Sequence, residues 1–170
     1  MLRAVLIGGT MLLTAGCAAG PQNQRATLLV SMTGIQEVPG PGAADGNGTV
    51  EVRVDPGSGQ VCWNLYARAI GPATAAHIHR GPAGVAGPVV LMLTTPDAAG
   101  RSQGCATVDP ALARELAYRG YEFYVNVHDA AHPAGAIRGQ LRGGPRPRER
   151  GVRISPSSAG SLLPSPSSQP

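Results

Sequence analysis

The residues best suited to chemistry are the four histidines, which all lie in two short motifs, AHIHRG and NVHDAAHP. Imidazole nitrogens are common ligands of zinc and copper, so histidines gathered in the fold would form a metal site. In the first motif, His77 and His79 are two residues apart. If this segment is a strand, both side chains point to one face and Ile78 points to the other. We expect Ile78 in the core, with the two histidines outside it, either exposed or in a groove covered by a loop.

The second motif has the same kind of pattern. Val125 and Val127 are the expected core residues of its strand, which puts His128 on the outer face. His132 comes four residues later, in a turn that could fold back toward the strand. The candidate ligands of a copper or zinc ion are therefore His77, His79, His128 and His132. The alternative is structural, because the ring N–H groups could bond loop carbonyls and hold the Gly-Pro turns in place.

Few other polar residues suggest a reaction. Asp129 could ligate a metal or orient an imidazole, although a turn acid is the simpler interpretation. Glu37 and Glu122 are single acids that we expect in turns or at the surface, and the outward strand position of Arg138 fits solvation. The serines lack a nucleophile-elbow context, and no phosphate-loop sequence occurs. We therefore expect a protein that is not an enzyme.

The elements that must position the histidines are short strands. Residues 49–54 and 61–68 alternate apolar and polar types around a Pro-Gly turn, which predicts a β-hairpin with Trp63 in the core. Further strands are predicted at 26–33, 75–79, 88–93, 104–108, 122–128 and 136–141. Asp109 and Pro110 favour the start of one short helix. About eight short strands predict an all-β fold, a Greek-key β-sandwich or barrel.

Charge argues against a nucleic-acid partner. The chain carries +4 overall, but six of its fourteen arginines lie near the two ends. Residues 17–141 hold eight arginines against nine acids, so the folded part is nearly neutral. Binding to nucleic acid would need basic residues clustered on the domain itself.

The N-terminus predicts export. Residues 1–16 read as a signal peptide, with Arg3 before an apolar stretch too short to span a bilayer as a helix. The sequence LLTAGC resembles the lipobox of bacterial lipoproteins, which predicts lipidation of Cys17 and a membrane anchor. Cleavage nearby without lipidation, giving a secreted protein, is the alternative. Residues 17–25 would then be a tether, 26–142 the β domain, and 143–170 a disordered tail rich in Arg, Pro and Ser.

Two cysteines remain in the mature chain. In an oxidising envelope, Cys62 and Cys105 are most simply a disulfide. A zinc site shared by two cysteines and two histidines is less favoured, because the spacing lacks a CxxC arrangement.

Three segments together resemble the CHRD domain, a family first described in chordin and present in many bacterial proteins. They are GIQEVPG, GPATAAHIHRGPAGVAGPVVLML and YVNVHDAAHPAGAIRGQL, within roughly residues 26–142. The resemblance implies an immunoglobulin-like β-barrel with a limited likeness to copper/zinc superoxide dismutase, in which an H-x-H strand supplies copper ligands. It implies no established activity.

Three functions follow as hypotheses. The first is a lipid-anchored protein of the bacterial cell envelope whose domain is a non-catalytic binding or structural module, with a protein or an envelope polymer as partner. The second is an envelope protein that binds copper or zinc through the histidines. A dismutase-like oxidoreductase is the least favoured. The resemblance to superoxide dismutase implies a two-metal site with about six histidines for that chemistry, and this chain has four.

Overall fold

The structure is a computed structural model that describes residues 24–143. The predicted signal peptide, Cys17 and the predicted tail from residue 144 onward lie outside the described residues. The strands are β1 Ala26–Thr33, β2 Asn47–Asp55, β3 Gln60–Arg68, β4 Ala73–Arg80, β5 Val89–Leu93, β6 Arg101–Thr107, β7 Phe123–Asp129 and β8 Ile137–Gln140. One α-helix, α1 Pro110–Tyr118, and two 3-10 turns, η1 Gly34–Gln36 and η2 Gly120–Glu122, complete the fold.

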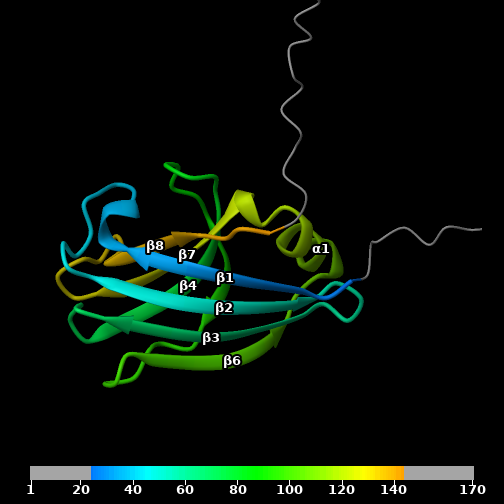
Figure 1. Ribbon diagram of the computed structural model, residues 1–170, viewed down its shortest axis with the longest axis horizontal. Coiled ribbons are helices and arrows are strands. Elements are labelled where there is room, and N and C mark those ends of the chain that lie inside the picture. The colour runs from blue at the N-terminus through cyan, green and yellow to red at the C-terminus, as the bar shows by residue number, and fades with distance from the viewer. Residues whose placement is uncertain (1–23, 144–170) are drawn as a thin grey trace, which may run out of the picture.

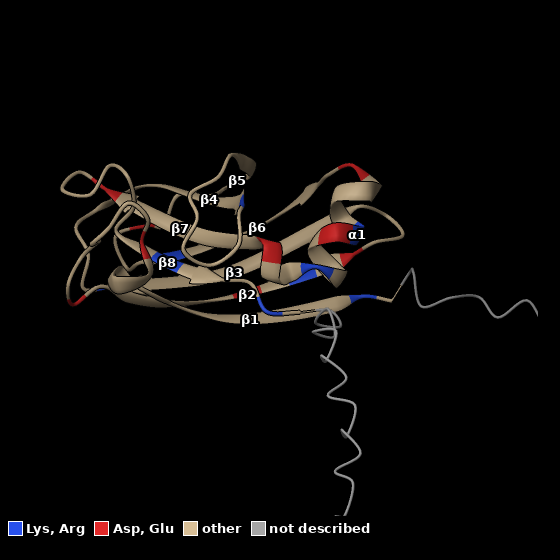
Figure 2. Cartoon of the chain, turned by 90° about the horizontal axis from the view of Figure 1, so that it is seen from above, with Lys and Arg blue, Asp and Glu red and all other residues tan. Residues whose placement is uncertain are grey.

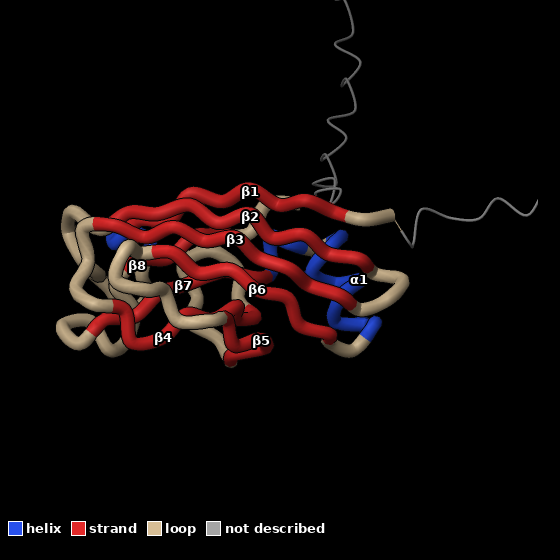
Figure 3. Tube along the Cα trace, turned by 90° about the horizontal axis from the view of Figure 1, so that it is seen from below, coloured by secondary structure: helices blue, strands red, loops and turns tan. Residues whose placement is uncertain are grey.

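All eight strands join one antiparallel sheet in the order β5-β4-β7-β8-β1-β2-β3-β6 (Figure 1). The sheet curls so that its two end strands, β5 and β6, come close to each other (Figure 3). The result is a nearly closed barrel. The predicted all-β, barrel-like fold with one short helix is confirmed.

The hairpin β2–β3 is formed where the alternation predicts it. Val50, Val52 and Val54 face the interior from β2, and Trp63 and Leu65 face it from β3. The indole N–H of the tryptophan donates to the hydroxyl of Ser102 on the neighbouring strand, which satisfies its polar group inside the core. Strand β6 begins three residues earlier than predicted, because Arg101–Gly104 continue the ladder with β3.

Helix α1 lies at one end of the barrel (Figure 1). The carboxylate of Asp109 accepts a hydrogen bond from the N–H of Ala111, so the predicted N-cap is present. The buried side of the helix consists of Ala113, Leu116 and Ala117. Among residues 24–143, no helix is long and apolar enough to cross a membrane.

The predicted disulfide is confirmed. Cys62 of β3 and Cys105 of β6 are direct cross-strand partners, and their sulfurs are bonded. The bridge ties the edge strand β6 to the hairpin.

The outer face of the sheet differs between its two halves. On β2 and β3, the outward residues are mostly exposed or half-buried. On β7, all residues but His128 are buried, so both faces of this strand are covered. The covering comes from two loops. Hydrogen bonds hold residues 81–88 against β4, β7 and β8, and they hold residues 34–46 against Ala136, just before β8. His77 and His79 on β4 and His128 on β7 belong to this second half.

Candidate metal centre

Strands β4 and β7 bring three of the four histidines together. The two strands are antiparallel neighbours, with His77 opposite Asn126 and Ala75 opposite His128. Ile78 is fully buried in the core, so His77 and His79 lie on the opposite face, as the strand period predicts. His77 and His128 are half-buried, whereas His79 is buried beneath the loop of residues 81–88. Of the two placements expected for the pair, exposed or beneath a loop, the structure therefore shows the second for His79.

The hydrogen bond of His79 leaves one ring nitrogen available. Its Nδ1 lies 2.8 Å from the carbonyl oxygen of Gly87. Because a carbonyl can only accept, Nδ1 carries the proton, and the Nε2 of the neutral ring keeps its lone pair. This Nε2 is buried and has no hydrogen-bond partner among residues 24–143. Buried polar atoms are usually paired, so this nitrogen is available to a group outside the described residues.

His128 is held in the same way. Its Nδ1 donates to the carbonyl oxygen of Pro133 at 3.0 Å, which leaves Nε2 as the atom with a lone pair. That Nε2 lies 3.2 Å from Nδ1 of His77. Histidines that ligate metals typically donate their second ring N–H to a carbonyl or a carboxylate, which fixes the ring. Two of the three rings already have this arrangement.

Electrostatics favour the metal-binding, neutral form of His77 and His128. Burial lowers the pKa of His77, and repulsion from the neighbouring rings of His128 and His79 lowers it further. Burial also lowers the pKa of His128, against a smaller opposing effect of its bond to Pro133. A metal competes with protons for these nitrogens, so lowered pKa values favour metal binding near neutral pH.

The spacing of the three rings fits one metal ion. Their ligand nitrogens lie within 4.8 Å of one another. Bonds of ~2.0–2.1 Å place the ligand nitrogens of a tetrahedral ion about 3.3 Å apart, so a closure of at most ~1.5 Å is needed. Three imidazoles suit zinc or copper. Within the described part of the chain, the group contains no carboxylate or thiolate.

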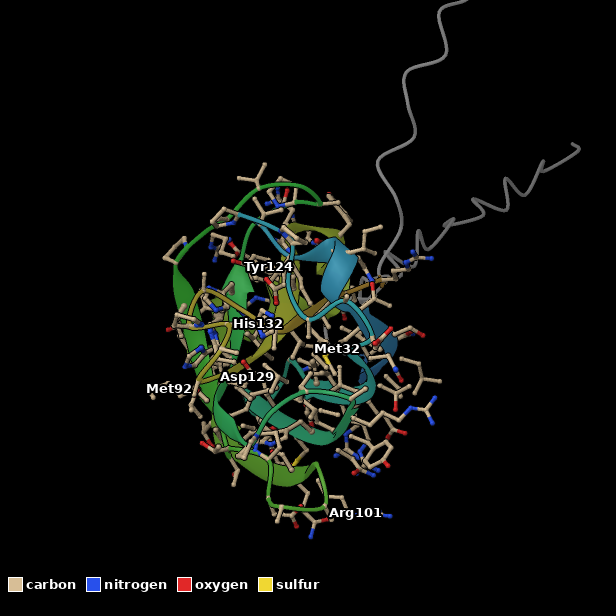
Figure 4. The ribbon with its side chains drawn as sticks, turned by 90° about the vertical axis from the view of Figure 1, so that its left-hand side faces the viewer. Met32, Met92, Arg101, Tyr124, Asp129 and His132 are labelled. Atoms are coloured by element: carbon tan, nitrogen blue, oxygen red, sulfur yellow. A yellow bond between two sulfur atoms is a disulfide. The ribbon has the colours of Figure 1, made fainter. Side chains whose placement is uncertain are left out.

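His132, the fourth candidate, is not part of this group. Its ring Nδ1 lies 2.9 Å from the Asp129 carboxylate, and its backbone N–H donates to the same oxygen (Figure 4). The other carboxylate oxygen of Asp129 accepts from the N–H of Gly71. Burial raises the pKa of this acid, but the bonds from His132 and Gly71 outweigh it and lower the pKa overall. The pair therefore holds two turns together at the end of β7.

Arg138 is a correction to the sequence analysis, which places it in solvent. It is only 1% exposed. Its Nη2 donates to the carbonyls of Pro82 and Val85, and its guanidinium lies 3.4 Å from the ring centre of Tyr124. The outward parity is right, since Arg138 is opposite Asn126 on β7. The error arises because two loops cover this face, and strand alternation does not report on loops. In Figure 2, blue marks part of β8, on a sheet that is otherwise mostly tan.

Glu37 is a second correction, because the structure buries it where the sequence predicts a turn or surface acid. It is 4% exposed, and one carboxylate oxygen has no hydrogen-bond partner in the described chain. Burial raises the pKa of Glu37 to about 7, even though the nearby Arg138 and the N–H of Val38 lower it. Its carboxylate occupies the space beside Gly135, which lacks a side chain. The sequence offers only the glycines of the two segments that contain Glu37 and Gly135 as a signal of this contact. A glycine does not show which side chain packs against it.

Comparison with known proteins agrees with the resemblance of the motifs. No curated protein and no solved structure matches the chain. A family model for the CHRD domain matches residues 28–141, a stretch that contains all eight strands apart from the first two residues of β1. The match spans well over half of the sequence, and the chain belongs to the CHRD domain family.

Proposed function

We propose that this protein is a non-catalytic binding module that holds one copper or zinc ion through His77, His79 and His128. The observation that carries the proposal is the buried Nε2 of His79, which has no partner within residues 24–143 and lies beside two further imidazoles. The carbonyl bonds of His79 and His128 support the proposal, because they hold the rings in the tautomer that a metal requires.

The donor set also predicts an order of affinity. Nitrogen sites follow the Irving–Williams order, in which Cu²⁺ binds more tightly than Zn²⁺. We therefore expect this site to prefer Cu²⁺ to Zn²⁺ when both are offered. The three imidazoles are neutral, so the charge of the bound ion is not compensated by its ligands.

The test is calorimetric titration of the full chain with Zn²⁺ and with Cu²⁺. The wild type should bind one equivalent, and His77→Ala/His79→Ala should abolish the binding. His132→Ala is the matched control, because this imidazole belongs to the second motif but is bonded to Asp129. Binding that survives the double substitution, or that is lost in the control, would contradict the assignment.

We also propose that the protein is anchored to the membrane of the bacterial cell envelope through lipid on Cys17. The support is the sequence LLTAGC after an apolar stretch. The N–H of Gln24 donates to the hydroxyl of Tyr118 on α1, so the described chain begins at the helix end of the barrel.

Mass spectrometry of the membrane fraction tests the anchor. A mature N-terminus at Cys17 carrying acyl chains is expected, and Cys17→Ser should release the protein from the membrane fraction. An unmodified N-terminus downstream of Cys17 would instead support the secreted alternative.

The proposal that the module is not an enzyme has a separate test. Metal-loaded protein should show no dismutation of superoxide in a xanthine-oxidase and cytochrome c assay. Robust activity that disappears in His77→Ala would favour the oxidoreductase alternative.

A further inference from the structure

The loop of residues 81–88, which we call the covering loop, supplies the hydrogen bond that fixes His79. It begins directly after β4 and leads into β5. Most of its residues are exposed, so the loop has little apolar burial of its own to hold it on the sheet. Backbone hydrogen bonds hold its two ends, and polar side chains of β4, β7 and β8 hold the part between them.

Arg138 makes the central contacts with the covering loop. One guanidinium nitrogen donates to both Pro82 and Val85, at 3.0 and 2.9 Å. At the start of the loop, Gln140 donates to the carbonyl of Gly81. Bonds from charged donors are stronger than neutral ones, and a buried arginine deprived of its acceptors would be costly. The arginine therefore ties the middle of the loop to β8.

Tyr124 links the arginine to the histidine. It lies on β7, which is between the strands of His79 and Arg138 in the sheet. The His79 ring stacks on the Tyr124 ring, with centroids 4.7 Å apart and planes 8° from parallel. The guanidinium of Arg138 also lies over the tyrosine ring, at 3.4 Å. In addition, the tyrosine hydroxyl accepts the N–H of Gly87, the residue whose carbonyl meets His79.

From these contacts we propose that Arg138 is a positioning residue of the metal site. Acting through Tyr124 and the covering loop, it keeps the Gly87 carbonyl on Nδ1 of His79 and so leaves Nε2 as the ligand atom. The inference rests on the proposed function, since it concerns the same site. A neutral imidazole has two tautomers, and the bond made by one nitrogen decides which nitrogen can bind metal. Release of the loop would free Nδ1 and let the proton move to Nε2.

The matched control is Arg101. It is also an arginine stacked on a tyrosine, with its guanidinium 5.6 Å from the ring centre of Tyr66. It lies on the edge strand β6, at the far side of the molecule from Tyr124 (Figure 4). Substituting it removes the same charge and the same type of stacking without touching the covering loop.

The first measurement is the tautomer of His79, read from the ¹⁵N chemical shifts of its ring in the metal-free full chain. The wild type and Arg101→Gln should carry the proton on Nδ1, whereas Arg138→Gln should shift it toward Nε2. Tyr124→Phe keeps the ring but loses the hydroxyl bond to Gly87, and it should shift the tautomer less. This variant keeps the test available if Arg138→Gln does not fold.

The second measurement is Zn²⁺ affinity by calorimetry on the same proteins. Loss of an outer hydrogen bond typically weakens a metal site about 10–100-fold, which we expect for Arg138→Gln, with a smaller loss for Tyr124→Phe. An unchanged tautomer and unchanged affinity in both variants would overturn the inference, even if the protein became less stable. If the wild type binds no metal, the proposed function fails, while the tautomer comparison still decides the role of Arg138.

Discussion

The two halves of the barrel differ in whether their outer faces are exposed to water or covered by loops. In the β1–β2–β3–β6 half, the outward side chains are largely exposed to water, and the inward ones make an apolar core. In the β4–β7–β8 half, loops cover the outer face and bury a layer of polar groups, including Asn126, Arg138 and Glu37. The first half resembles an ordinary sheet with one wet side. The second half has an additional polar interior, and it is there that the histidines meet.

This difference separates stability from function. Apolar burial in the first half stabilises the fold without constraining any chemistry. The polar layer of the second half is costly, because buried groups such as Arg138 Nη1 have no partner within residues 24–143. Such a layer is what holds a ligand nitrogen in a chosen tautomer.

The largest effect is expected in the first half. Replacing both Cys62 and Cys105 by alanine removes a cross-link that closes 43 residues. In the chain-entropy model, this costs about 4 kcal/mol of unfolding free energy. Because the bridge lies on β3 and β6, Zn²⁺ affinity should stay at the wild-type value. Urea denaturation and calorimetry measure the two quantities. A parallel loss of affinity would show that the halves are not separable.

The next effect is a pH dependence in the second half. The pKa of Glu37 is about 7 in the folded chain, against its usual 4.5, because burial disfavours the charged form. The folded state therefore holds this proton more tightly than the unfolded state does. Its contribution is complete below pH 4.5 and is lost as the pH rises through 7.

Glu37→Gln cannot lose a proton and should escape this loss. Relative to the wild type, the variant should gain about 3 kcal/mol between pH 4.5 and about pH 8. Urea denaturation of both proteins at both pH values measures this gain. Comparing the variant with the wild type cancels the contributions of the other acids. A difference that does not change with pH would mean that Glu37 is not buried as described.

A smaller effect tests the contact between Glu37 and Gly135. Gly135 has φ +145°, and an added Cβ would overlap the Glu37 carboxylate. Gly135→Ala should therefore lose about 2 kcal/mol of stability, from backbone strain and overlap together. In a chain that already carries Glu37→Ala, Gly135→Ala should cost less stability than it does in the wild type. Additive losses in this double-mutant cycle would rule out the contact.

The smallest effect concerns the helix at the end of the barrel. Asp109→Ala removes the oxygen that accepts the N–H of Ala111, a change that usually costs about 1 kcal/mol. Thermal unfolding should show the loss. Metal affinity should be unchanged, since the hydrogen bond that is lost lies within the first turn of α1 and involves none of the three histidines.

The sequence predicts the half with an exposed outer face better than the half that loops cover. Alternation of Val50, Val52 and Val54 with polar residues predicts the hairpin correctly, because one face is wet. The same reasoning puts His77 and His79 on a common outer face, which is right. It cannot show that β4 and β7 are neighbours, because that pairing joins segments about fifty residues apart.

The polar layer escaped prediction for a different physical reason. The outward parity of Arg138 is correct, but the carbonyls of Pro82 and Val85 that meet it belong to a loop. Turn residues such as Gly and Pro mark where a loop is, and they do not say which face it covers. His132 shows the converse. Its spacing in the sequence is compatible with a fourth metal ligand, but its ring is bonded to the nearby Asp129.

The most direct test of the account is a crystal structure of the protein soaked with Zn²⁺, with the metal located by its anomalous scattering. We predict one strong peak ~2.0–2.1 Å from Nε2 of His79 and from ring nitrogens of His77 and His128. The Nδ1 of His79 should still meet the Gly87 carbonyl in that structure. A peak at His132 and Asp129, or no ordered peak at the three-histidine cluster, would contradict the central claim.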